Sequence, residues 1–320
     1  VTENVFSSES HILEINSKSG LYPLYMTYSI FRNRVEEKHP NVEPDSLPIE
    51  TQQKLWDKTI AENIFVICKT PMAKAITQRT LVGFRPVESV NTRYFEDLIN
   101  QITHKADKFT RRVKRGKVYW KANNNDNMKF DAIVGNPPYM EMDGGAGASS
   151  TPIYNHFVDI AKKINPRFIS MIMPTRWYSG GKGLDEFRDS MLNDKNIAVL
   201  HDFLNPEYVF PRTNIRGGIC YFLWDESYNN KENLTKVITH RQGYETVSVM
   251  RSLKNSESDI FIRFETAMRV LEKVKGHNDF QSFENHVSSR RPFGLDGSFI
   301  NDKDFKSSKV GLATPLTCYG

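Results

Sequence analysis

The sequence contains few cysteines, and none of them lies at a spacing that suits a metal ion. Three occur in 320 residues, at positions 68, 220 and 318. Scattered cysteines in odd number are typical of a reducing compartment, so we expect a cytoplasmic protein without structural zinc. The eight histidines are also dispersed along the chain. We therefore predict no metal site.

Long apolar runs are missing as well. No stretch approaches the ~18 apolar residues that a membrane-spanning helix needs, and the first ten residues, VTENVFSSES, have no signal-peptide pattern. No internal repeat is found. The hydrophobic content of 39% and the charged content of 25% are those of an ordinary globular protein, so we expect no membrane partner. The length suits one complete α/β core and part of a second unit.

The most informative segment is FDAIVGNPPYMEMDGG, residues 130–145. A short apolar strand is followed there by Asn136, Pro137, Pro138 and Tyr139. Open α/β sheets bind ligands at the carboxyl ends of their strands. The asparagine offers a carbonyl oxygen, the stiff diproline presents the main-chain carbonyl of its first residue, and the tyrosine offers a ring for stacking. Such a loop suits a planar amine, although a proline-rich turn that only closes a strand is the alternative.

NPPY after a strand resembles the catalytic motif of amino-methyltransferases that use S-adenosylmethionine as methyl donor. Most of these are N6-adenine DNA methyltransferases, and a smaller group modifies glutamine side chains in proteins. The elements that follow are similar to the second half of the gamma-class N6-adenine methylases, above all to large Type IIG restriction-modification enzymes. The resemblance covers roughly residues 10–250. It implies an α/β fold, a Rossmann-like S-adenosylmethionine-dependent methyltransferase sheet with helices on both faces, and catalysis by the four NPPY residues on a flipped adenine.

The segment ILEINSKSGLYPLY, residues 12–25, resembles the cofactor-binding turn of these families. A buried strand, a polar turn and a helix start follow one another, as in the first half of a nucleotide-binding α/β unit. The resemblance implies that Glu14, Asn16 and Gly20 hold the methionine end of the cofactor and that Asp97 accepts from its adenine amino group. The alternatives are an ordinary strand-turn-helix and, for Asp97, a surface carboxylate.

Two features depart from the family pattern. Lys18 stands where the family has the first glycine of the turn. No acid follows the second predicted strand, which ends at Cys68, although the family uses one there to hold the ribose hydroxyls. Both departures put the affinity for the cofactor in question.

Basic residues are concentrated in one stretch. Eight lie between positions 105 and 121, against the single acid Asp107, although the net charge of the whole chain is only +5. Such a stretch predicts a surface that faces the phosphates of double-stranded DNA, with a solvated helix or hairpin face as the alternative. The residues predicted to contact DNA are Arg111, Arg112, Arg115, Arg176, Lys182, Arg290 and Arg291. The last two are equally well explained as linker charges.

The texture of the sequence changes near residue 255. We expect a methyltransferase catalytic domain over residues 1–254 and the truncated start of a C-terminal target recognition domain over residues 255–320. The chain begins close to its first motif and stops at TPLTCYG. We therefore expect a fragment of a larger protein, and whether its other domains include a nuclease or a helicase stays open.

Local patterns predict several further elements. Thr70 and Pro71 suit the start of a helix over residues 71–79, and a strand is expected over residues 81–84. Thr151 and Pro152 are expected to cap a helix, and residues 261–275 to form an amphipathic helix. The glycine-rich loop after NPPY is expected to be mobile and to close over an extruded base.

Three functions remain open from the sequence. The first is a site-specific DNA adenine N6-methyltransferase of a restriction-modification system. The second is a protein-glutamine methyltransferase that uses the same grip on an amide. The third is a DNA-binding module whose cofactor site has degraded, as Lys18 and Cys68 suggest.

Overall fold

The structure is a computed structural model that describes residues 5–87, 90–120, 127–141, 150–213, 215–228, 232–255 and 258–281. The chain divides into two compact units, residues 1–267 and 268–320. Helix α9 (Glu265–Lys275) runs across the division, and the rest of the described structure before it belongs to the first unit. The predicted domain border at residue 254 stays a prediction.

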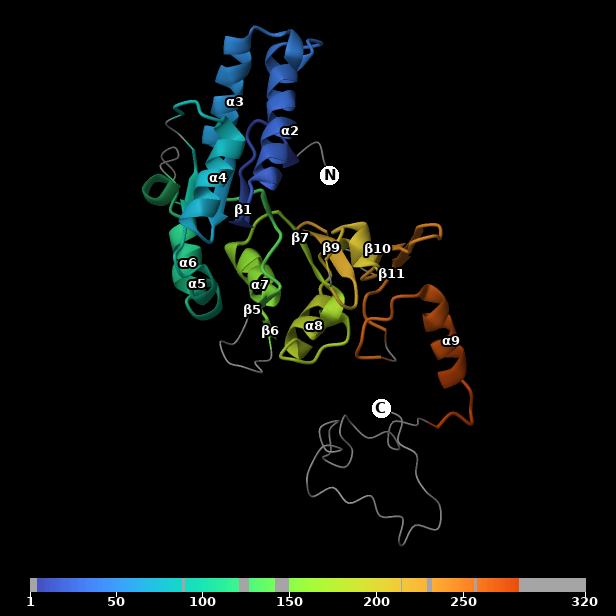
Figure 1. Cartoon of the computed structure of the whole chain (residues 1–320). Helices are drawn as coiled ribbons and strands as arrows, with labels where there is room; N and C mark the ends of the chain where they lie inside the picture. Colours follow the sequence, from blue (N-terminus) through green and yellow to red (C-terminus); the bar gives the residue numbers. More distant parts are fainter. Residues whose placement is uncertain are drawn as a thin grey trace. The chain divides into compact units, whose positions relative to one another are not determined.

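A large sheet forms the centre of the first unit (Figure 1). Its nine described strands run from one edge to the other in the order β3-β2-β1-β4-β7-β9-β8-β10-β11. Strand β9 is antiparallel to both of its neighbours, and the edge strand β11 is antiparallel to β10. The remaining pairs are parallel. The strands are β1 (Ile12–Ser17), β2 (Ile64–Cys68), β3 (Thr92–Tyr94), β4 (Ala132–Gly135), β7 (Phe168–Pro174), β8 (Ile197–Phe203), β9 (Ile219–Asp225), β10 (Thr235–His240) and β11 (Val247–Arg251).

The direction in which the chain builds the sheet reverses between β1 and β4. The chain passes outward from β1 through β2 to β3 and then returns to form β4 on the other side of β1. The two strands are in register, with Glu14 opposite Val134. In open α/β sheets such a reversal leaves a crevice outside the carboxyl ends of the two strands, and ligands bind there.

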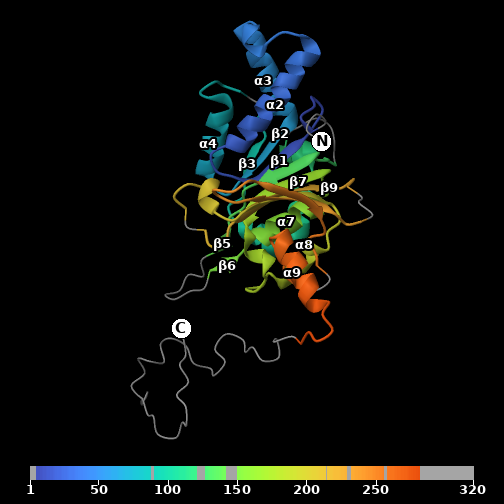
Figure 2. The same cartoon turned by 90° about the vertical axis from the view of Figure 1, so that its right-hand side faces the viewer.

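Helices cover both faces of this sheet (Figure 2). Side chains of β1 alternate between the two faces. Ile12 packs in a cluster with Met26 and Ile30 of α2, whereas Leu13 and Ile15 belong to the larger core on the opposite face. Helices α2, α3 and α4 contact β1 and β2, and α7 contacts β7 and the pair α5 and α6. The predicted α/β fold with helices on both faces is thereby confirmed. The helices are α2 (Leu21–Lys38), α3 (Ile49–Asn63), α4 (Pro71–Val82), α5 (Leu98–His104), α6 (Ala106–Val113), α7 (Tyr154–Ile164) and α8 (Asp185–Leu192), with short turns η1 (Pro44–Ser46), η2 (Gly116–Trp120), η3 (Thr175–Tyr178) and η4 (Pro206–Tyr208).

Two local predictions about the first half of the chain have different outcomes. The Thr70 side chain accepts a hydrogen bond from the amide of Ala73 at 3.1 Å, so the predicted N-cap of α4 is confirmed. The strand predicted over residues 81–84 is wrong. Leu81 is buried and continues the helical period of α4, which ends at Val82 and is capped by Gly83 with a φ of 61°. The edge strand of the sheet is β3 instead.

Two predicted helix starts are also corrected. Residues Thr151–Pro152 form strand β6, which pairs with β5 (Met140–Glu141), and α7 begins only at Tyr154. Helix α9 does not begin at residue 261, because the amide of Phe261 donates to the Tyr178 carbonyl at 2.9 Å and its ring is buried. Among the described helices, none has the length and apolar content to cross a membrane.

Arg263 fastens the segment after β11 to the sheet. Its guanidinium donates to the Thr175 hydroxyl at 2.6 Å and to the Gly217 carbonyl at 2.7 Å, and it lies 3.1 Å from the carboxylate of Asp202. Asp202 is fully buried, and burial raises its pKa to about 6, although Arg263 and a hydrogen bond from Tyr178 oppose the rise. These contacts hold the segment after β11 against Asp202 of β8 and against the residues that follow β7 and precede β9.

Candidate active site

The NPPY loop, residues 136–139, leaves β4 at the reversal point of the sheet. Gly135 precedes it, and a Cβ at that position would lie 3.0 Å from the Ile15 carbonyl of β1, so only glycine permits this approach without a shift. The side-chain amide of Asn16 donates to the main-chain carbonyl of Asn136 at 3.2 Å. At the other end of the loop, the Ile153 amide donates to the Tyr139 carbonyl at 3.2 Å. The loop is therefore fixed at both ends.

The side chains of the loop differ in what they leave available. Within the described structure, the Asn136 side-chain amide forms no hydrogen bond with another residue. Pro137 is buried. The hydroxyl of Tyr139 is buried without a described partner, and burial, together with the nearby Tyr22 and Cys220, raises its pKa. The asparagine amide thus remains free for a ligand, whereas the tyrosine contributes its ring rather than an ionisable hydroxyl.

A pocket of about 490 Å³ opens where β1 and β4 end. It brings together four residues that the sequence predicted for the site: Glu14, Asn16, Gly20 and Asn136. Sequence analysis did not assign the aromatic residues of this pocket, which are Tyr22, Tyr25 and Phe210. Tyr22 and Tyr25 lie on α2 directly after the predicted cofactor turn, so their place in the sequence could have indicated that they line the pocket. Phe210 lies far along the chain, and its place in the pocket depends on the folded structure.

Glu14 is the most unusual group in this pocket. It is only 3% exposed, and its Oε2 atom has no hydrogen-bond partner among the described residues. Burial raises its pKa from 4.5 to about 7, and a hydrogen bond from Ser17 opposes this only in part. A buried acceptor without a partner is destabilising, so its presence in a pocket points to a cationic or hydrogen-bond-donating ligand.

The turn from β1 to α2 has left-handed residues at two positions. Its positive φ values fall at Asn16 (76°) and Gly20 (78°), and Lys18 stays outside the left-handed region. A Cβ on Gly20 would come within 3.0 Å of Thr77 on α4, and the Thr80 hydroxyl of the same helix donates to the Ser19 carbonyl at 2.6 Å. Lysine at position 18 therefore does not prevent the turn.

A second hollow of about 290 Å³ adjoins the first. Tyr22 lines both hollows, and Gly135 contributes the β4 end to the second. Its further lining residues come from the neighbouring strands and the segment near η4: Ser170, Met171, Ile172, Phe203, Val209 and Tyr221. The site is thus extended along the carboxyl side of the sheet beside the NPPY loop.

Asp97 does not line this pocket. It is exposed, stands immediately before α5, and accepts a hydrogen bond from Asn100 at 2.6 Å. Cys68 ends β2 in a fully buried position. The proposed contact of Asp97 with the cofactor's adenine therefore remains a prediction.

The basic residues predicted to contact DNA lie in several places. Arg111, Arg112 and Arg115 are exposed on α6 and just after it, and the Arg112 guanidinium lies over the rings of Phe95 and Tyr119 at 5.1 and 5.4 Å. Their exposure is compatible with both alternatives. Arg290, Arg291 and the loop of residues 142–149 that was expected to close over a base lie outside the described residues.

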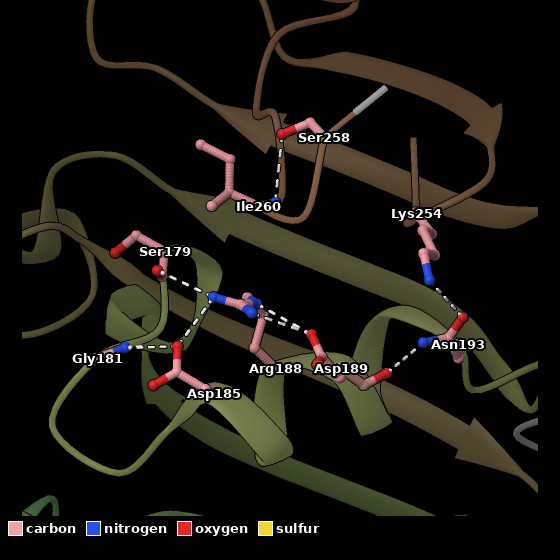
Figure 3. Close-up of polar contacts among 9 residues, drawn as sticks. All are labelled: Ser179, Gly181, Asp185, Arg188, Asp189, Asn193, Lys254, Ser258 and Ile260. Atoms are coloured by element: carbon pink, nitrogen blue, oxygen red, sulfur yellow. Dashed lines mark hydrogen bonds and ion pairs between the residues drawn. The ribbon is translucent and has the colours of Figure 1, made fainter. Parts of the chain in front are cut away.

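Two other predicted DNA contacts follow β7. Arg176 is exposed in η3, and Lys182 lies in the next loop with a φ of 52°. Figure 3 shows how this loop is held: Asp185 accepts from the Gly181 amide at 3.1 Å and from Arg188 at 3.0 Å, and Arg188 also donates to the Ser179 carbonyl at 3.3 Å. Two side chains of α8 therefore hold the backbone of the loop that contains Lys182.

The strand order, with the reversed strand β9 inserted between β7 and β8, and the pocket at the β1–β4 reversal agree with the Rossmann-like methyltransferase sheet that the sequence resemblance implies. Residues 62–210 match the family model described as Eco57I restriction-modification methylase. The predicted resemblance to restriction-modification methylases is confirmed by this match.

Individual relatives are similar over part of their length. An uncharacterized adenine-specific methylase of Mycoplasma pneumoniae is 34% identical over 143 residues, which is 42% of this chain and 34% of that protein. The chain thus matches about a third of this curated relative. Two solved structures also align: the methyltransferase subunit of a type I restriction-modification system from Streptococcus thermophilus (10% identity, 84% of this chain, 48% of that chain, TM-score 0.43) and the Type IIL restriction-modification enzyme MmeI in complex with DNA (10%, 76%, 34%, TM-score 0.48).

Proposed function

We propose that this chain is the methylase part of a restriction-modification enzyme and transfers a methyl group from S-adenosylmethionine to N6 of an adenine in double-stranded DNA. The observation that carries the proposal is the single pocket lined by both Glu14 and Asn136, whose two loops are joined by the hydrogen bond from Asn16. A methyl donor bound by the first loop would lie next to an amine bound by the second. The match of residues 62–210 to a restriction-modification methylase family supports the same function.

The residues of the pocket fit S-adenosylmethionine. When bound, the cofactor supplies a methyl group on a positively charged sulfur. Among the described residues, the Oε2 atom of Glu14 has no partner, so it can accept from the ammonium of the amino acid end. Gly20 also lines the pocket and allows the turn to pack closely against α4. The volume of about 490 Å³ is within the range of pockets that hold ligands of this size.

Asn136 and the NPPY backbone would bind the adenine amino group. The side-chain oxygen of Asn136 and the main-chain oxygen of Pro137 would each accept one N6 hydrogen, which holds the nitrogen lone pair toward the methyl group. Positive charge develops on that nitrogen during transfer, and two fixed acceptors stabilise it. Most of the rate enhancement would then come from positioning.

A stacked adenine cannot reach this site inside a duplex, so the base must be flipped out. Unstacking costs a few kcal/mol, and stacking on aromatic side chains recovers about 1–3 kcal/mol per base. We assign this stacking to Tyr139, which belongs to the same loop as Asn136 but lines neither of the two described hollows. The ring of Phe210, which lines the pocket together with Asn136, supplies a second face. The exposed Arg111, Arg112, Arg115, Arg176 and Lys182 are the proposed phosphate contacts, and the remaining domains of a larger parent, a nuclease or helicase among them, are proposed partners.

A methyl-transfer assay on two substrate classes tests the proposal. The chain is incubated with S-adenosylmethionine carrying a deuterated methyl group and either genomic DNA from a strain without adenine methylation or a protein extract. Mass spectrometry of the digested DNA should show deuterated N6-methyladenine, and Asn136→Ala should remove it. Deuterated methylglutamine in the protein arm would assign the alternative methyltransferase function. Binding of DNA without binding of S-adenosylmethionine would assign the DNA-binding module.

A further inference from the structure

The pocket carries one basic side chain, Lys18, beside the buried acid. Lys18 is exposed, lines the pocket together with Glu14, and forms no hydrogen bond or ion pair with another described residue. Burial raises the pKa of Glu14 and the Ser17 hydrogen bond lowers it in part, and no lysine contributes to the shift. The two opposite charges therefore line one pocket without pairing with each other.

The start of α2 adds positive potential on the side of Lys18. This helix has 18 residues, begins at Leu21 after Gly20, and has neither a side-chain cap nor an acid in its first turn. The amides of Leu21 and Tyr22 are therefore open to an anion, which the helix dipole also favours, whereas Pro23 has no N–H and the Leu24 amide donates to the Gly20 carbonyl at 2.9 Å. Leu21 and Tyr22 of this first turn line the same pocket.

The pocket is thus lined by a buried acidic group and by an exposed cationic group with a helix N-terminus. A ligand end that carries both an ammonium and a carboxylate on adjacent atoms matches this arrangement. Glu14 supplies the independent sign that a ligand belongs here, because its Oε2 atom is buried in the pocket without a partner.

We propose that Lys18 binds the α-carboxylate of the amino acid end of S-adenosylmethionine, while Glu14 binds its ammonium. The inference rests on the proposed function and deepens it. Where the family has the first glycine of the turn, this chain then has a side chain whose ammonium reaches the carboxylate from the exposed side.

Calorimetry with two thioether analogues tests the assignment without any need for turnover. S-adenosylhomocysteine carries both the amine and the carboxylate, whereas S-adenosyl-3-thiopropylamine keeps the amine and lacks only the carboxylate. Lys18→Met should weaken binding of S-adenosylhomocysteine about tenfold and leave S-adenosyl-3-thiopropylamine unchanged. The loss should shrink at high salt because Lys18 is exposed. Lys18→Arg should bind S-adenosylhomocysteine nearly as well as the wild type.

The controls separate this inference from the proposed function. Lys54→Met removes an equal charge from an exposed position on α3, outside the pocket, and should bind both analogues like the wild type. Glu14→Gln should weaken both analogues, because both carry the amine. Equal losses for the two analogues in Lys18→Met, or no loss, would overturn the role of Lys18 while leaving the cofactor site intact. A wild type that binds neither analogue would overturn the proposed function and, with it, this inference.

Discussion

Glu14→Gln should make the cofactor-free protein more stable at neutral and basic pH, although it removes a proposed cofactor ligand. In the folded protein the pKa of Glu14 is raised from 4.5 to about 7, chiefly by burial. Between these two values the native state binds more protons than the unfolded state, so the free energy of unfolding falls as the pH rises. At about 1.4 kcal/mol per pKa unit, an ionised Glu14 in the empty pocket costs about 3 kcal/mol above pH 7. Glutamine has the same shape and carries no charge.

Urea unfolding followed by tryptophan fluorescence measures this difference. All four tryptophans lie within residues 1–267, so the signal reports on the unit that contains the pocket. The free energy of unfolding of Glu14→Gln should exceed that of the wild type by less than about 1 kcal/mol at pH 5 and by about 3 kcal/mol at pH 8. Glu37→Gln changes an exposed glutamate at the far end of α2, and its difference in unfolding free energy from the wild type should not increase with pH.

Addition of the cofactor should reverse the order. S-adenosylhomocysteine at saturation should stabilise the wild type by compensating the Glu14 carboxylate, and should stabilise Glu14→Gln much less. A stability difference that stays constant from pH 5 to pH 8, or a wild type that is the more stable protein at pH 8, would refute the view that Glu14 is held ionised at a cost for the sake of a ligand.

Three further changes probe the loop and its surroundings. Asn136→Ala should retain S-adenosylhomocysteine binding in calorimetry and lose at least about a hundredfold in methyl transfer, since a free acceptor is removed; near-normal transfer would contradict its role. Tyr139→Phe removes a buried hydroxyl without a partner, so urea unfolding should show equal or slightly higher stability, by up to ~1 kcal/mol, with transfer retained; a loss as large as that of Asn136→Ala would exclude simple stacking. Arg263→Met leaves Asp202 unpaired in the interior and should cost about 3 kcal/mol at pH 8 and less at pH 5, where Asp202 (pKa about 6) is protonated; an equal cost at both pH values would contradict the ion pair.

Much of the fold was predictable because its strands are short, apolar and buried on both faces. The buried strand predicted within residues 12–25 is β1 (Ile12–Ser17), and the helix predicted from residue 71 is α4, which begins at Pro71. The strand predicted over residues 81–84 was wrong because an apolar run of that length does not distinguish a strand from the last turn of a helix. Strands β10 and β11 were not predicted, because β11 lies at the sheet edge and is mostly exposed, so its apolar pattern is weak.

The site was predictable only as far as its motifs reach. The NPPY loop and the turn after β1 each have a local signature, and both lie where the strand ends required. Asp97 was assigned by resemblance alone, and nothing in its surroundings obliges an exposed helix-start carboxylate to turn toward the pocket. Phe210 has no local signature at all, because it enters the pocket from a segment that follows β8 and η4.

Lys18 illustrates why a departure from a motif needs the backbone to be interpreted. From the sequence, loss of a glycine suggested a damaged turn and a weaker cofactor site. In the structure the left-handed conformations fall on Asn16 and Gly20, so position 18 accepts a side chain without backbone strain. The lysine at this position adds a positive charge to the pocket that Glu14 also lines. Asn16, in turn, uses its amide to hold the carbonyl of Asn136, 120 residues away, and so couples the two loops whose ligands must meet. Lys18 in the turn and Asn136 in the NPPY loop are therefore compatible with one pocket, in which Lys18 should distinguish a ligand with a carboxylate from one without it.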